Sequence, residues 1–342
     1  MIEQEQIYEL LKNYLSFVKQ TLKLKDDLIV NFDTMISHNG EINAEITRKN
    51  GGLLVKFTDF FVKNIADSID YKYFADLDEE TASSCSNIFY SFLFRYFEGT
   101  TCLIEFKNLI TYFVVLNVFN HEISHYLLGH LDEGNGCFSE NESSSKERGI
   151  AHIVKEYAAD TIGIFLTLQY IFDKNFSEIT AFNICDEKTT PDCIKQLFVT
   201  FLSAIYVQYD LLSQFSNNGN GSWNIEERSH PHIFVRLINS EHLLNEFIVN
   251  KLNEANNLTD RESNSVIGFF VRDALNSMLP FFKANFKLSL SDVLLSKNAW
   301  EQRFAILDYA QENGLGSKPI IDFRGFAKFD EKEKQKILNR CK

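Results

Sequence analysis

The sequence predicts an α+β protein that is predominantly helical, with a small N-terminal β-hairpin or sheet and a helical C-terminal region. Residues 108–120 form an apolar segment that is too long for one strand and contains neither Gly nor Pro. Residues 41–47 alternate apolar and polar side chains before an Asn-Gly-Gly turn at 50–52, and residues 53–58 form the returning strand. Hydrophobic residues make up 45% of the chain and 32 residues are Phe, so aromatic clusters such as 88–97 are expected to be core helix faces.

The hairpin is predicted from local pattern alone. Ile42, Ala44 and Ile46 alternate with polar neighbours, Asn50 to Gly52 supply the turn, and residues 53–58 return. The edge of such a hairpin could bind an extended peptide through main-chain hydrogen bonds. The alternative is a two-stranded flap that only covers the core, and the sequence leaves both open.

The first motif with clear chemistry is His121-Glu122-Ile123-Ser124-His125, in the last turns of a helix expected over about 108–129. Residues four apart lie one above the other on a helix, so His121 and His125 can bind one ion while Glu122 leans over its open side. Gly129 suits the left-handed conformation that ends a helix. The motif therefore predicts a zinc site at the end of a core helix.

A catalytic zinc usually has three protein ligands and one water, so the two histidines need a third partner. In motifs that extend HExxH with a third His, that His stands six residues after the second one, where this chain has Leu131. His130 is one residue away from this position and is expected to cap the helix or to lie on the surface. The preferred candidate is Glu156 in a second helix over about 150–172. His152, one turn earlier on the same face, is its competitor.

Asp160 lies one turn after Glu156, where its carboxylate can accept the spare N–H of a metal-binding His. Ala158, Ala159 and Gly163 surround this face. Small residues there would let the second helix approach the first closely, as a short Glu side chain requires if it is to reach the metal. The alternative is an ordinary amphipathic helix with solvated carboxylates.

The pair HEISH (121–125) and KEYAAD (155–160) resembles the HExxH and ExxAD motifs of gluzincin metallopeptidases, especially the HtpX heat-shock and CAAX prenyl protease type. Ser229-His230-Pro231, followed by Arg236, is similar to the His-Pro and downstream Arg of that group. The resemblance implies a zincin-like catalytic core, in which His230 helps to stabilise the oxyanion and Arg236 buttresses the site. Pro231 suits the first position of a helix, and a plain helix start is the alternative interpretation.

The longest apolar runs, 110–119, 162–172 and 197–207, are shorter than the roughly 20 residues that a membrane-spanning helix needs. The chain opens with acid where a signal peptide would be basic. A soluble protein of this size with the HExxH, ExxAD and His-Pro motifs resembles the Lit phage-exclusion peptidases more closely than the membrane-bound group, over about 120 of the 342 residues. These features predict a cytoplasmic protein.

A net charge of −13 argues against binding to nucleic acid or to anionic membrane surfaces, both of which attract basic patches. The six cysteines show no CxxC spacing, which indicates reduced thiols in a reducing compartment. The expected partner is a protein or peptide substrate.

The expected organisation is a zincin-like metallopeptidase domain over 1–240 and a helical region over 241–342 packed on it. Further helices are expected over 243–252 and 323–341. Two polar loops, 132–149 and 216–223, flank the predicted site as lids or disordered segments. Trp223 in the second loop is either an anchor over the site or a packed aromatic.

The expected function is that of a soluble zinc-dependent endopeptidase with one Zn²⁺ per chain, acting in phage exclusion or stress response. His121, His125 and Glu156 would hold the ion, and Glu122 would move a proton from water to the leaving amine. One alternative is a non-catalytic interaction protein stabilised by a metal. Another is a regulatory peptidase that cleaves a repressor.

Overall fold

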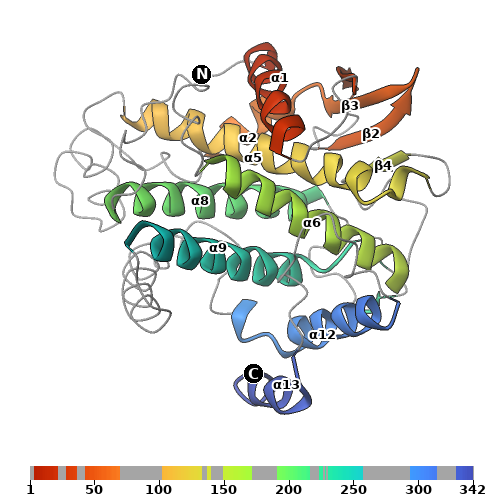
Figure 1. Cartoon of the computed structure of the whole chain (residues 1–342), viewed down its shortest axis with the longest axis vertical. Helices are drawn as coiled ribbons and strands as arrows, with labels where there is room; N and C mark the ends of the chain where they lie inside the picture. Colours follow the sequence, from red (N-terminus) through yellow and green to blue (C-terminus); the bar gives the residue numbers. More distant parts are fainter. Residues whose placement is uncertain are drawn as a thin grey trace.

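The structure is a computed structural model that is mostly helical with one small sheet (Figure 1), which confirms the predicted helical α+β class. The residues that it describes are 4–21, 28–36, 43–69, 102–132, 137–139, 149–171, 191–215, 223–225, 228, 230–256, 293–313 and 329–341. Its helices are α1 (Gln4–Thr21), α2 (Phe61–Ile69), α5 (Cys102–Leu127), α6 (Ile150–Ile171), α8 (Pro191–Phe215), α9 (Ile233–Asn256), α12 (Lys297–Glu312) and α13 (Glu331–Leu338).

A central group of four helices carries most of the core. Helix α5 packs against α6 and α8, and α9 packs against the same two helices. Figure 1 shows the sheet and α1 on one side of this group, with α12 and α13 on the other. The two predicted motif helices are present as α5 and α6, and their facing sides are almost entirely buried.

The sheet has four strands in the order β1-β3-β2-β4. The predicted hairpin is β2 (Ala44–Lys49) and β3 (Gly52–Thr58), joined by Asn50 and Gly51, which have φ angles of 52° and 81°. Two successive positive φ values are typical of a type I′ turn, which matches the twist of the hairpin. The structure adds β1 (Val30–Met35), parallel to β3, and β4 (Cys137–Ser139), antiparallel to β2.

The expectation that a hairpin edge is available to a peptide needs correction. Strand β2 pairs with β3 on one side and with β4 on the other, because the chain that follows α5 returns to the sheet. Strand β3 is likewise enclosed between β1 and β2. Among the described strands, only β1 and β4 are edges, so neither strand of the predicted hairpin offers one.

The backbones of α5 and α6 are in close contact at Gly163. A Cβ atom at this position would lie 2.8 Å from the backbone N of His121 and 3.0 Å from its Cα. Real Cβ atoms do not make backbone contacts this short, so only glycine fits. The predicted role of a small residue in bringing the Glu helix to the HExxH helix is therefore confirmed at Gly163.

A buried polar network fixes the register of these helices next to His121. The hydroxyl of Tyr14 in α1 donates to Oδ1 of Asn120 at 2.7 Å. Asn120 Nδ2 donates to the Thr167 hydroxyl at 2.9 Å, and that hydroxyl donates to the carbonyl of Gly163 at 2.8 Å. Three helices are thus tied together by hydrogen bonds that have no competition from water.

The start of α9 differs from the prediction. The helix begins at Ile233, so Pro231 is not its first residue, and the prediction of a helix from 231 is wrong in this respect. The N–H of Phe234 donates to Nδ1 of His232 at 3.2 Å, which makes His232 the capping side chain. Burial, with a contribution from the nearby Arg228 charge, lowers the pKa of His232 to about 3 and so keeps the ring neutral.

Trp223 stacks on His232, with ring centroids 3.7 Å apart. This contact supports the packed-aromatic interpretation of Trp223. Gln302 of α12 accepts the backbone N–H of His232 at 2.8 Å, and Arg303 donates to the Tyr157 hydroxyl at 3.1 Å. Helix α12 therefore braces both the His-Pro segment and the Glu helix α6.

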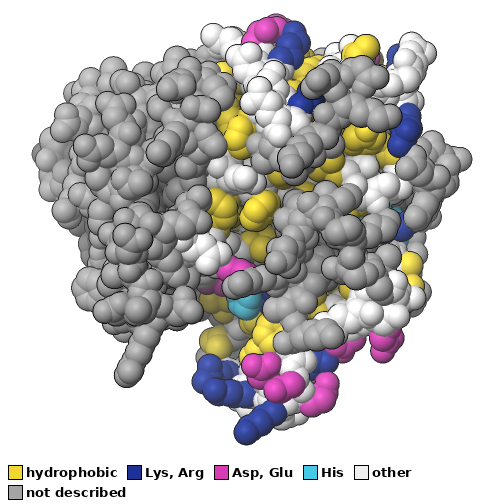
Figure 2. All heavy atoms as spheres, in the orientation of Figure 1, with side chains coloured by type: hydrophobic (Ala, Val, Ile, Leu, Met, Phe, Trp, Pro, Cys, Tyr) yellow, Lys and Arg dark blue, Asp and Glu magenta, His cyan; other side chains and the backbone are white. Residues whose placement is uncertain are grey.

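Helix α13 is a charged surface element. Lys334 donates to both oxygens of Asp308 at 2.8 Å and joins α13 to α12. Figure 2 shows charged side chains of both signs gathered at this end of the molecule. The expected helix over 323–341 is described only from 329 and is helical over 331–338, whereas 243–252 lies inside α9.

Several predictions fall on residues outside the described part of the chain. These are the aromatic segment 88–97, Ser229, most of the loops 132–149 and 216–223, and Cys85 and Cys185. Cys341 is a free, partly exposed thiol. In the part of the chain that the structure describes, no helix is both long enough and apolar enough to cross a membrane.

Gly163→Ala should lower the free energy of unfolding by about 1 to 3 kcal/mol, because the new methyl group forces α5 and α6 apart. Helix propensity alone predicts the opposite sign, a gain of up to about 1 kcal/mol. Urea unfolding of the metal-free protein measures the difference. An unchanged or increased stability would show that the two helices are not in this contact.

Candidate metal centre

Two histidines of α5 and one glutamate of α6 meet in the interior. Nε2 of His121 and Nε2 of His125 are 3.1 Å apart, as expected for residues one helical turn apart. Glu156 Oε2 lies 3.2 Å from His121 Nε2, and Oε1 lies 3.6 Å from His125 Nε2. The three side chains are at most 2% exposed. The structure thus brings together the three residues predicted to hold the ion.

This group could bind a metal ion, since one ligand atom from each residue lies within 4.8 Å of the others. Among the described residues it is the one such group of His, Cys, Asp and Glu. Both oxygens of Glu156 are buried, and each lies within 3.6 Å of imidazole nitrogens, with no Arg or Lys among its partners in the described residues. A cation bound between the imidazoles would balance the charge of this buried carboxylate. Two nitrogens and one oxygen suit zinc and leave its fourth position open.

The electrostatics favour the forms that bind a metal. Burial opposes ionisation of Glu156, but the neighbouring imidazoles, His230 foremost, outweigh it and hold the pKa of this carboxyl well below its usual range. Burial lowers the pKa of His125, although Glu156 acts in the opposite direction. An ionised carboxylate and a neutral imidazole are the ligand forms that metal binding requires.

Asp160 orients the first histidine. Its Oδ1 lies 3.0 Å from His121 Nδ1, so the carboxylate can accept that N–H and leave Nε2 for an ion, as the sequence spacing predicts. Arg236 donates to Oδ2 through Nε at 2.8 Å and to Oδ1 through Nη2 at 2.6 Å. Burial would raise the pKa of Asp160, but the Arg236 charge and the His121 contact lower it. Arg236 also lies over the Tyr209 ring at 5.1 Å.

Two further histidines surround Glu156. His230 Nε2 lies 3.1 Å from Oε2, and His152 Nε2 lies 3.5 Å from Oε1. Their rings are 6.3 Å apart, and neither belongs to the group of three ligand atoms. Arg228 donates to the carbonyl of His230 at 3.1 Å within this segment, and its own carbonyl accepts the N–H of Gly149, just before α6, at 3.2 Å. Glu122 is fully buried on α5 beside His121.

His130 does not lie where the sequence placed it. It was expected to be a capping or surface histidine, yet it is buried and its Nδ1 lies 2.9 Å from Nδ1 of His125. The position of His130 in the sequence does not suit a third ligand, but it allows His130 to contact Nδ1 of His125, the nitrogen that faces away from the group of three. This role depends on the chain reversal after Gly129, which the sequence signalled only as a helix end.

Sequence reasoning also missed Gln302 and Arg303, which brace His232 and Tyr157. They are more than sixty residues from their partners along the chain, and no motif marks them. Asn120 was missed as well. A polar residue within an otherwise apolar segment, directly before His121, is a signal that could have pointed to it.

The chain was compared with models of protein families, with curated proteins and with solved structures. None of the three comparisons found a match. The site is therefore interpreted from its own geometry and from its motifs.

The purified protein should contain about one zinc ion per chain, and His121→Ala, His125→Ala and Glu156→Ala should each lose most of it, because a three-residue site cannot spare a ligand. His152→Ala is the matched control, since this imidazole also touches Glu156 but lies outside the group. It should retain zinc. Elemental analysis after gel filtration measures the content. Stoichiometric zinc in the Glu156 variant together with loss in the His152 variant would reverse the ligand assignment.

Proposed function

We propose that the protein is a zinc-dependent endopeptidase that hydrolyses peptide bonds in proteins. The observation that carries this proposal is the His121, His125 and Glu156 group, together with Glu122, which directly follows His121 on α5 and is fully buried. A site that serves only stability normally has four protein ligands and needs no neighbouring base. A cytoplasmic role in phage exclusion or stress response rests on the resemblance to the Lit peptidases.

Zinc, when bound, supplies a water of lowered pKa and a Lewis acid for the peptide carbonyl. His121 and His125 would hold it through Nε2, because their Nδ1 atoms face Asp160 and His130. Glu156 would be the third ligand. Glu122 would accept the proton of the attacking water as general base and then give it to the amine nitrogen as the C–N bond breaks.

His230 is proposed to stabilise the oxyanion. It lies in the segment before α9 and contacts the same oxygen of Glu156, Oε2, that His121 does. The N–H of Gly149, just before α6, donates to the carbonyl of Arg228 at 3.2 Å and ties this segment to the site. An imidazole N–H so close to the ligands could donate to a carbonyl oxygen as negative charge develops on it. Arg236 acts indirectly, by holding Asp160 against His121.

One observation favours a second candidate, a non-catalytic protein stabilised by its metal. All of the ligand side chains, together with Glu122 and His230, are at most 3% exposed. A structural metal needs no access for a substrate, and His230 or His152 could serve as a fourth ligand. The two candidates differ in whether Glu122 matters.

Glu122→Gln should abolish peptide-bond cleavage while leaving zinc content and folding unchanged, because it removes the general base but keeps the shape of the side chain. Labelling of new protein N-termini in cells that express the wild type or the variant measures cleavage and identifies the substrate. Termini that appear in both would assign the cleavage to another enzyme. The absence of new termini in either, with zinc bound in both, would support the metal-stabilised interaction protein.

His230→Ala should lower kcat on a peptide identified in that way by on the order of a hundredfold, with zinc content unchanged and KM little altered. The reason is that the imidazole is proposed to contact charge that exists only in the transition state. Steady-state kinetics and elemental analysis on the same preparation separate the possibilities. Loss of zinc would make His230 a ligand, and unchanged kinetics would make it only part of the segment before α9.

A further inference from the structure

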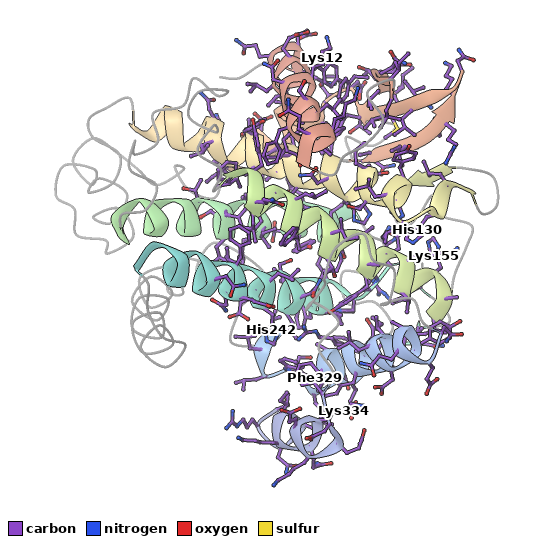
Figure 3. The ribbon with its side chains drawn as sticks, viewed as in Figure 1. Lys12, His130, Lys155, His242, Phe329 and Lys334 are labelled. Carbon is purple, nitrogen blue, oxygen red and sulfur yellow. The ribbon has the colours of Figure 1, made fainter. Side chains whose placement is uncertain are left out.

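The far side of the His125 ring faces another histidine. His130 is buried, and its Nδ1 lies 2.9 Å from His125 Nδ1, with ring centroids 5.1 Å apart. Figure 3 labels His130 at the C-terminal end of α5. The other ligand histidine, His121, has a carboxylate in the equivalent position, so the two ligands are supported by different chemistry.

The local fold explains why His130 can reach this position. Helix α5 ends at Leu127, and Gly129 takes a φ of 76°, in the left-handed region that side chains disfavour. The chain then turns back in a 3₁₀ segment, His130–Asp132, that packs on the end of α5. Strand β4 follows and pairs with β2, which anchors the returning chain to the sheet. A histidine directly after the helix is thereby folded back under the second ligand.

The contact has a chemical consequence for metal binding. Nε2 of His125 points toward His121 and Glu156, so it is the nitrogen that would bind the ion. A neutral imidazole that uses Nε2 as a ligand carries its proton on Nδ1. Between two Nδ1 atoms at 2.9 Å one must donate and the other accept, so His125 donates and His130 accepts. His130 then carries its own proton on Nε2.

We propose that His130 is a positioning residue of the metal centre. By accepting the Nδ1–H of His125, it selects the tautomer in which Nε2 is available to the ion and fixes the plane of the ring. The acceptor for His125 is thus a neutral imidazole, whereas the acceptor for His121 is the anion Asp160. The inference rests on the proposed metal centre and deepens it. It predicts that the identity of the atom at the His130 Nδ1 position, and not the bulk of the side chain, controls how tightly the site binds its ion.

Two variants of similar size separate these possibilities. His130→Asn places Oδ1 near the position of Nδ1 and keeps an acceptor, whereas His130→Leu removes the acceptor. His130→Leu should weaken zinc binding by about 10- to 100-fold and alter the visible spectrum of the Co²⁺-loaded protein, while His130→Asn should stay within a few fold of wild type. Competition with a chromogenic chelator gives the Kd for zinc. Urea unfolding of the metal-free variants confirms that both are folded.

A second measurement does not depend on any variant. Long-range ¹H–¹⁵N NMR of the imidazoles in the zinc-loaded wild type should show the proton of His125 on Nδ1 and that of His130 on Nε2. Zinc binding in His130→Leu equal to wild type, equal weakening in both variants, or a His130 that carries its proton on Nδ1 would each overturn the proposal and leave the metal centre standing. A wild-type protein that binds no zinc would overturn the proposed function as well.

Discussion

The close packing of α5 against α6 is the constraint on which the rest of the structure depends. Because Gly163 has no side chain, the two helices meet backbone to backbone at His121. At this separation the short side chains of Glu156 and Asp160, one turn apart, reach opposite nitrogens of the same imidazole, at 3.2 and 3.0 Å. A wider separation would remove both contacts together. The Tyr14, Asn120 and Thr167 network and the brace from α12 hold the helices in this register.

Two buried carboxylates on one helix face are costly unless each has a partner, and they are compensated in different ways. Asp160 has a permanent cation, because Arg236 binds both of its oxygens. Glu156 is surrounded by imidazoles, and within the described ranges it forms no ion pair with Arg or Lys. A metal bound between the imidazoles would supply the cation that this second carboxylate lacks. This difference explains why the two acids, one turn apart on α6, would have different roles. Asp160 would orient His121, and Glu156 would be a metal ligand.

Local patterns predicted much of this arrangement. The apolar segment before His121, the helical spacing of Glu156 and Asp160, and the Asn-Gly-Gly turn involve only neighbouring residues. They predicted α5, α6 and the hairpin, respectively. The sequence could not predict strand β1, which pairs with the distant β3, or the three-residue β4, which is too short to leave a pattern. The contact of His130 depends on the φ of Gly129, and the brace from Arg303 spans 146 positions of the chain. Such contacts depend on tertiary packing, which cannot be predicted from the spacing of residues along the chain.

Two imidazoles and one carboxylate are proposed to hold a metal ion and to leave one coordination position open. Zinc K-edge X-ray absorption on the zinc-loaded protein tests this claim directly. We expect two imidazole nitrogens at about 2.0 to 2.1 Å, oxygen ligands at about 2.0 to 2.2 Å and no sulfur near 2.3 Å. A spectrum with three or four imidazoles would show that His230 or His152 completes a closed structural site. That result would contradict the claim and, with it, the proposed catalysis.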